Sequence, residues 1–153
     1  MHTINDNIID QMLESPYWII DILPTRVPDN GKGKYFEVEQ YYLKHTNVDQ
    51  IFQKFANVLL KLNCYENVDL LTQNEGWLFN PAPDTLADHV MKCPDNYHNL
   101  IILLKNWDAM ITLNGDDTYM TAYNLNANSR DMLRDFAVSE GLFLWNPQEK
   151  EKV

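Results

Sequence analysis

The segment from Leu100 to Leu125 constrains the fold more than any other part of the chain. It holds three strand-like runs, at Leu100–Leu104, Ala109–Leu113 and Thr118–Leu125, separated by short polar stretches. The second and third runs flank the turn Asn114-Gly115-Asp116-Asp117, and an Asn-Gly pair between strand-like runs is typical of a β-hairpin. Short connections predict antiparallel neighbours, because parallel strands need a much longer crossover.

Helical periodicity is clearest just upstream of this meander. Over Val48–Leu62 the apolar residues fall on one stripe of a helix, and Asn47 with Gln50 fits a capping box at its start. Further helices are predicted over residues 4–14, Pro83–Lys92 and Ser129–Glu140. Gly141 follows the last of them in the position where a left-handed residue commonly ends a helix.

Other segments are predicted to be extended, because they are rich in β-branched and aromatic residues or end at proline. They are Tyr17–Leu23, Tyr35–Leu43, Val68–Thr72, Trp77–Phe79 and Leu142–Trp145. Alternation in the second segment places Glu37 and Glu39 on one solvated side. These patterns predict an α+β fold with a mainly antiparallel sheet of about five to seven strands and three to four packed helices. We expect residues 1–153 to form a single domain with a frayed tail at 148–153.

The charge balance limits the classes of partner. The chain has 22 acidic residues against 12 basic ones, a formal net charge of −10. Such a surface repels nucleic acid and anionic membranes, whereas a basic protein or a cation fits it. No secretory signal or membrane-spanning run is evident, and Cys64 and Cys93 are too few for a disulfide framework. We therefore expect a cytoplasmic protein without a cofactor.

Several polar groups are candidate sites, each with a simpler explanation. The adjacent carboxylates of Asp116 and Asp117 suit a cation or acid/base chemistry, but aspartate is also a common turn residue. His89, Cys93 and His98 are of the ligand types that zinc prefers, yet paired metal-ligand spacing is absent. A buried thiol with two surface imidazoles explains these three residues better.

Two further features give weak signals. The loop Asp29–Lys34 has glycines and lysines that suit an anion, but it lacks the spacing of a phosphate-binding loop, and a basic surface loop is the better interpretation. His45 belongs to the residue type that can change charge near neutral pH, but this holds for most surface histidines. No Gly-x-Ser-x-Gly elbow is present, and no Cys–His pair follows from the spacing, so nucleophilic catalysis finds no support.

Aromatic residues exceed what one small core needs. Tyr119, Thr121 and Tyr123 alternate and therefore share one face of a strand. If helices cover only the other face, these rings join nearby acidic groups in a tyrosine-rich surface suited to a basic protein. The predicted binding residues are Glu37, Glu39, Tyr41, Asp116, Asp117, Tyr119 and Tyr123. The alternative is that the rings are buried in a three-layer packing.

Two functions of different classes remain open. The first is a non-enzymatic interaction protein that binds a basic partner, as an immunity-type inhibitor of a basic toxin or nuclease does. The second is an enzyme or small-ligand-binding domain on the open sheet face, using Glu37, Glu39 and Asp117 with His45 or His98. A deep pocket containing at least two of these groups with perturbed pKa values distinguishes the second from the first.

Overall fold

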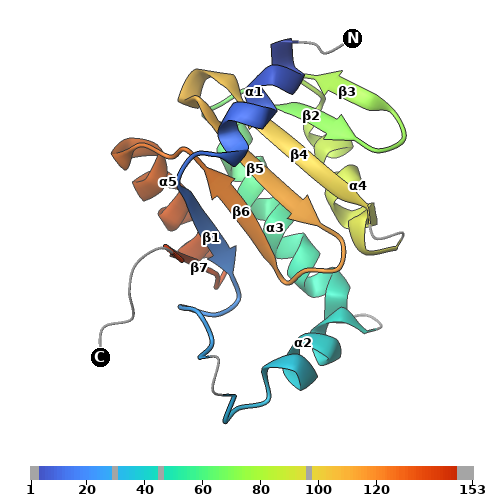
Figure 1. Cartoon of the computed structure of the whole chain (residues 1–153). Helices are drawn as coiled ribbons and strands as arrows, with labels where there is room; N and C mark the ends of the chain where they lie inside the picture. Colours follow the sequence, from blue (N-terminus) through green and yellow to red (C-terminus); the bar gives the residue numbers. More distant parts are fainter. Residues whose placement is uncertain (1–3, 29–30, 45–46, 96–97, 148–153) are drawn as a thin grey trace.

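One antiparallel sheet organises the chain. The computed structural model describes residues 4–28, 31–44, 47–95 and 98–147. Seven strands lie in the order β3-β2-β4-β5-β6-β1-β7, and every neighbouring pair is antiparallel (Figure 1). The strands are β1 (Tyr17–Asp21), β2 (Asp69–Thr72), β3 (Gly76–Phe79), β4 (Asn99–Leu104), β5 (Ala109–Asn114), β6 (Tyr119–Tyr123) and β7 (Phe143–Trp145).

Three helices cover one face of this sheet. Helix α3 (Asn47–Asn63) runs behind the strands in Figure 1, with α4 (Pro83–Lys92) and α5 (Ala127–Ser139) beside it. The predicted stripe of α3 is the reason, because its residues Phe55, Leu59 and Leu62 are completely buried in the main core. Each such side chain stabilises the fold by about 1.5–3 kcal/mol through the area it removes from water.

The opposite face is covered only in part. Helix α1 (Ile4–Leu13) lies in front of the sheet, where Ile9 and Met12 pack on Leu103 of β4 and Met110 of β5 (Figure 1). This second, smaller core sits over the β4 and β5 side of the sheet. The same face of β1, β6 and β7 is bordered instead by the chain that leads into α2 (Tyr35–Leu43).

The segment Tyr35–Leu43 is a helix, so its prediction as a strand is wrong. Its Val38 amide donates to the Lys34 carbonyl at 2.9 Å, and the Tyr35 hydroxyl donates to Glu39 Oε2 one turn away at 3.1 Å. Residues two apart on a helix lie roughly 200° apart, so Glu37 and Glu39 do not share a side. The aromatic residues favoured a strand, but the segment satisfies its backbone hydrogen bonds locally as a helix.

The other predicted elements are present, with bounds that differ by two residues or fewer. The described chain thus has an α+β fold, with five α-helices where three to four were expected. The turn after β5 forms as predicted, with the Asp117 amide donating to the Asn114 carbonyl at 3.2 Å. Asn47 is the first residue of α3 rather than its cap, and its side-chain Nδ2 donates to the Tyr41 carbonyl at 3.1 Å. The tail at 148–153 lies outside the described residues.

Helix α5 has well-formed ends. Asn126 and Ser129 make a reciprocal capping box at the start of the helix. The helix begins at Ala127, so its predicted start at Ser129 was two residues too late. At its end, Gly141 has φ +75°. The Leu142 amide donates to the Ala137 carbonyl and the Gly141 amide to the Val138 carbonyl. These are the two bonds of a Schellman motif, and they confirm Gly141 in its predicted position.

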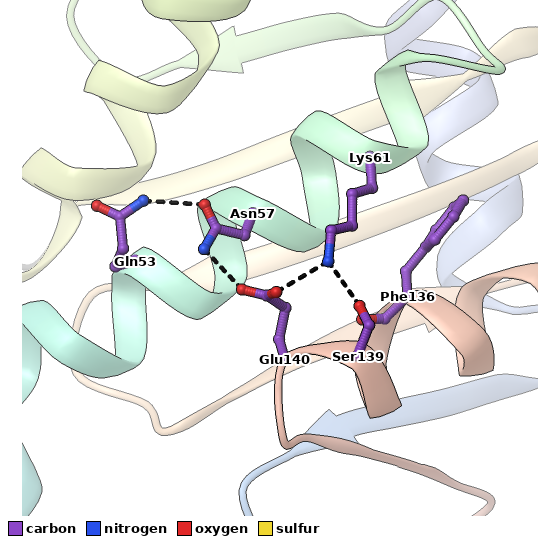
Figure 2. Close-up of polar contacts among 6 residues, drawn as sticks. All are labelled: Gln53, Asn57, Lys61, Phe136, Ser139 and Glu140. Carbon is purple, nitrogen blue, oxygen red and sulfur yellow. Dashed lines mark hydrogen bonds and ion pairs between the residues drawn. The ribbon is translucent and has the colours of Figure 1, made fainter.

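A polar cluster joins the end of α5 to α3. Glu140 accepts hydrogen bonds from Lys61 at 2.9 Å and Asn57 at 2.6 Å, and Lys61 also donates to Ser139 at 2.7 Å (Figure 2). The side chain of Glu140 is only 15% exposed. The hydrogen bond from Lys61 is the main cause that lowers the pKa of Glu140, with Asn57 adding to it against the effect of burial. The carboxylate is therefore stabilised in its charged form.

We predict that Gly141→Ala destabilises the protein by about 1–2 kcal/mol, because a residue with a Cβ resists the left-handed region. Gly33→Ala is the matched control, since an added Cβ there meets nothing within 4 Å and the backbone is not left-handed. Urea denaturation of both variants gives the comparison. Equal midpoints would mean that residue 141 does not keep its left-handed backbone in solution.

We predict that Glu140→Gln lowers the free energy of unfolding at pH 7 by about 1–2 kcal/mol, the value of hydrogen bonds to a charged group. Because the pKa of Glu140 is lowered from 4.5, the stabilisation is complete above that pH and is lost as the pH falls through the folded-state pKa. Urea titrations at pH 7 and pH 3 therefore show a deficit that shrinks in acid. The exposed pair of Asp131 with Arg130 supplies the control, and Asp131→Asn changes stability by about 0.5 kcal/mol or less.

Candidate functional site

A cavity of about 750 Å³ lies on the face of β1, β6 and β7 that α3 does not cover. Its floor consists of alternate residues from these strands: Tyr17, Ile19 and Asp21 of β1, Tyr119, Thr121 and Tyr123 of β6, and Trp145 of β7. Strand pairing sets their order, with Tyr17 opposite Tyr123 and Asp21 opposite Tyr119. One end of the floor is therefore purely aromatic, whereas the other carries a carboxylate.

The wall of the cavity comes from the chain between β1 and α2. Thr25–Pro28, Gly31, Gly33 and Lys34 line it, followed by Tyr35, Phe36 and Glu37 at the start of α2. Both described cations of this wall have partners within the chain. Arg26 donates to the Pro147 carbonyl at 3.0 Å, and Lys34 lies 3.5 Å from Glu37 Oε2 in an exposed ion pair.

Asp21 is the buried carboxylate of the cavity. The residue is 8% exposed, and its Oδ2 accepts a hydrogen bond from the Trp145 indole at 3.3 Å. Burial raises the pKa of Asp21, although the backbone amide of Leu23 and the Trp145 N–H partly offset it. The negative charge of Glu39 adds to the rise. A group whose charged form is disfavoured in this way weakens the fold at neutral pH.

Negative charge gathers around the tyrosines at the same end. Burial is the main cause that raises the pKa of Tyr119, and four carboxylates add to it: Asp117, Glu39, Asp21 and Asp116. Burial, followed by the charge of Glu39, raises the pKa of Tyr35 to about 12. Within the described part of the chain, none of these four carboxylates forms an ion pair with a lysine or arginine. The end of the cavity near Asp21 is thus an uncompensated negative site.

Helix α2 projects beyond the sheet at this end of the molecule (Figure 1). None of its residues is buried, and Phe36, Val38 and Tyr41 are 76%, 44% and 62% exposed. Soluble proteins seldom expose several large apolar side chains on one short helix without a binding role. Of these three side chains, Phe36 also lines the wall of the cavity.

The predicted binding residues are only partly together. The structure brings Glu39, Asp116, Asp117 and Tyr119 into one electrostatic environment. Glu37 lines the cavity wall and Tyr123 lines its floor. The ring centroids of Tyr123 and Tyr17 lie 5.7 Å apart. Tyr41 lies outside the cavity on α2, with its ring 5.6 Å from that of Tyr42.

Sequence reasoning missed Asp21 and Tyr17 as site residues. Their signal was the alternation of Tyr17–Leu23, which separates Tyr17, Ile19 and Asp21 from Trp18 and Ile20. Trp18 and Ile20 do face the main core. Considering the two faces of this strand separately would therefore have predicted a carboxylate on the face opposite the main core.

The remaining candidates do not join this site. Among the described residues, no group of three or more His, Cys, Asp or Glu side chains is arranged to hold a metal ion. Burial raises the pKa of Cys93 to about 12, so its thiol stays protonated, and His89 Nε2 lies 3.7 Å from Glu75. His45 and the start of the Asp29–Lys34 loop lie outside the described residues. The described part of that loop lines the cavity wall.

Comparison of the chain with protein-family models, with curated proteins and with solved structures finds no match in any of the three. Among the helices that the structure describes, none combines the length and the apolar character needed to span a membrane. The function of the protein is therefore inferred from the geometry and charge of the cavity and of α2.

We predict that Asp21→Asn raises the urea midpoint at pH 7, because the buried charge is removed while an oxygen remains to accept the Trp145 N–H. The pKa of Asp21 is raised from 3.8, so the wild-type protein gains stability as the pH falls through the folded-state pKa, and the difference disappears toward pH 4. Asp88→Asn, on the exposed side of α4, removes the same charge and serves as the control. A lower midpoint for Asp21→Asn would show that the charged form is stabilising.

Proposed function

We propose that this protein is a non-enzymatic interaction protein whose α2 helix and adjoining acidic cavity bind a basic protein. The observation that carries the proposal is the exposure of α2 beside this negative charge: it has no buried residue and exposes Val38 and Tyr41. It also carries Glu39, one of the four carboxylates near Tyr119 that form no ion pair with a lysine or arginine in the described structure. Exposed aromatic and aliphatic side chains provide the apolar contact that slows dissociation. The carboxylates attract a cationic partner and speed its association.

The net charge of −10 supports the same class of partner. Long-range attraction raises association rates with basic proteins by about 10-fold or more at low salt. This is the physical arrangement of an immunity-type inhibitor that neutralises a basic toxin or nuclease. No catalytic step is needed, because complex formation alone blocks such a partner.

The cavity favours a second function, the binding of a small ligand. Its volume of about 750 Å³ is that of a small-molecule site. Of the acid/base groups expected for an enzyme there, Glu37 lines the cavity, whereas Glu39, Asp117 and His98 do not. His45 lies outside the described residues. A ligand held inside the cavity does not need the exposed side of α2, so substitution of α2 separates the two functions.

We predict that Val38→Ser with Tyr41→Ser abolishes capture of a basic protein from lysates of cells that produce this chain, because the pair removes the exposed apolar contact. A supporting result requires that the captured protein is identified by mass spectrometry, is basic, and binds the purified wild-type chain at least about tenfold more tightly than the variant.

The control is a second pair of the same residue types on another surface. Val138 and Tyr65 are 59% and 65% exposed. The Tyr65 ring contacts one other aromatic ring, that of Phe136, just as the Tyr41 ring contacts that of Tyr42. Val138→Ser with Tyr65→Ser is expected to bind as the wild type does. Equal binding by both double variants would refute the role of α2.

A further inference from the structure

Building on the proposed function, we propose that the cavity on β1, β6 and β7 receives an arginine side chain of the basic partner, with the guanidinium group near Asp21 and against the aromatic floor. Tyr35, Phe36 and Glu37 of α2 line the cavity, so a partner bound to α2 lies beside it. The charge of the cavity, the engagement of its own cations and the aromatic residues of its floor all favour this occupant.

The charge of the cavity requires a cationic occupant. Asp21 is 8% exposed, and its surroundings include Glu39 rather than a lysine or arginine. A buried carboxylate without a cationic partner weakens the fold, and a cation that enters the cavity removes this cost. An anionic occupant would add to it. Asp21 accepts hydrogen bonds from the Trp145 indole and from the backbone amides of Leu23 and Ile22, so about one of the roughly four lone-pair sites of the carboxylate remains for a ligand.

The chain's own cations do not fill this role. Arg26 bonds the Pro147 carbonyl and Lys34 pairs with Glu37, so both are held at the wall by other groups. Neither forms an ion pair with Asp21 in the described structure. The negative site on the floor therefore remains open to a cation from another molecule.

The floor favours arginine over lysine. Tyr119, which lies opposite Asp21, and Trp145, whose indole donates to Asp21, place aromatic rings beside the carboxylate. A flat guanidinium stacks on such rings while its edge donates to a carboxylate. A lysine ammonium is more strongly hydrated and gains less from aromatic walls. The chain already uses the same contact on its other face, where Arg130 and Arg134 lie 5.7 and 5.5 Å from the Trp18 ring centre.

The test is an NMR titration of the full chain with two small probes, N-acetyl-arginine methyl amide and N-acetyl-lysine methyl amide. The readout is the indole N–H resonance of Trp145, assigned with Trp145→Phe, because that group donates to Asp21. We expect the arginine probe to shift this resonance and to bind about tenfold more tightly than the lysine probe. Asp21→Asn is expected to weaken the arginine probe by about tenfold, whereas Asp88→Asn leaves its affinity unchanged.

Other outcomes overturn the proposal. If the two probes bind equally, if neither moves the Trp145 resonance, or if Asp21→Asn behaves as Asp88→Asn does, the cavity is not an arginine site. Those results leave the α2 experiment untouched, since Val38 and Tyr41 do not line the cavity. Conversely, normal partner binding by the α2 double variant refutes the proposed function whatever the probes do.

Discussion

The unequal covering of the two sheet faces is the constraint on which the rest of this structure depends. Helix α3 buries its apolar stripe against one face, with α4 and α5 beside it. On the other face, α1 covers only the part around β4 and β5. Since successive strand residues point to opposite faces, β1 and β6 must present a second set of side chains on the face that α3 does not cover. Those side chains form the floor of the cavity.

Electrostatics gives that floor its character. Asp21, Glu39, Asp116 and Asp117 come from a strand, a helix and a hairpin, yet all act on the hydroxyl group of Tyr119. Burial and repulsion by a neighbouring carboxylate make the charges of Asp21 and Asp117 unfavourable for folding at neutral pH, since both effects raise the pKa values of these two groups. Natural proteins commonly give up stability at binding sites, where a ligand restores the missing interaction. A cationic partner is the ligand that would do so here.

Local patterns predicted most of the fold because their physics is local. The stripe of α3, the turn at Asn114–Asp117 and the left-handed Gly141 each depend on a few neighbouring residues. The prediction for Tyr35–Leu43 was wrong because strand propensity depends strongly on tertiary context, and the segment forms a helix despite its aromatic composition. The alternation of Tyr119, Thr121 and Tyr123 correctly placed them on one face. Asp21 was missed because its importance lies in what surrounds it.

The sequence by itself determined the α+β class, the order of nearly all elements and the negative charge, since periodicity, turn chemistry and composition act within short segments or sum over the chain. Only the tertiary structure decided that β1 lies between β6 and β7, and therefore that Asp21 faces Tyr119 and Trp145. Tyr119 and Trp145 lie 98 and 124 positions after Asp21 in the chain. The strand pairing is fixed by which faces the helices bury, a property that no local pattern carries.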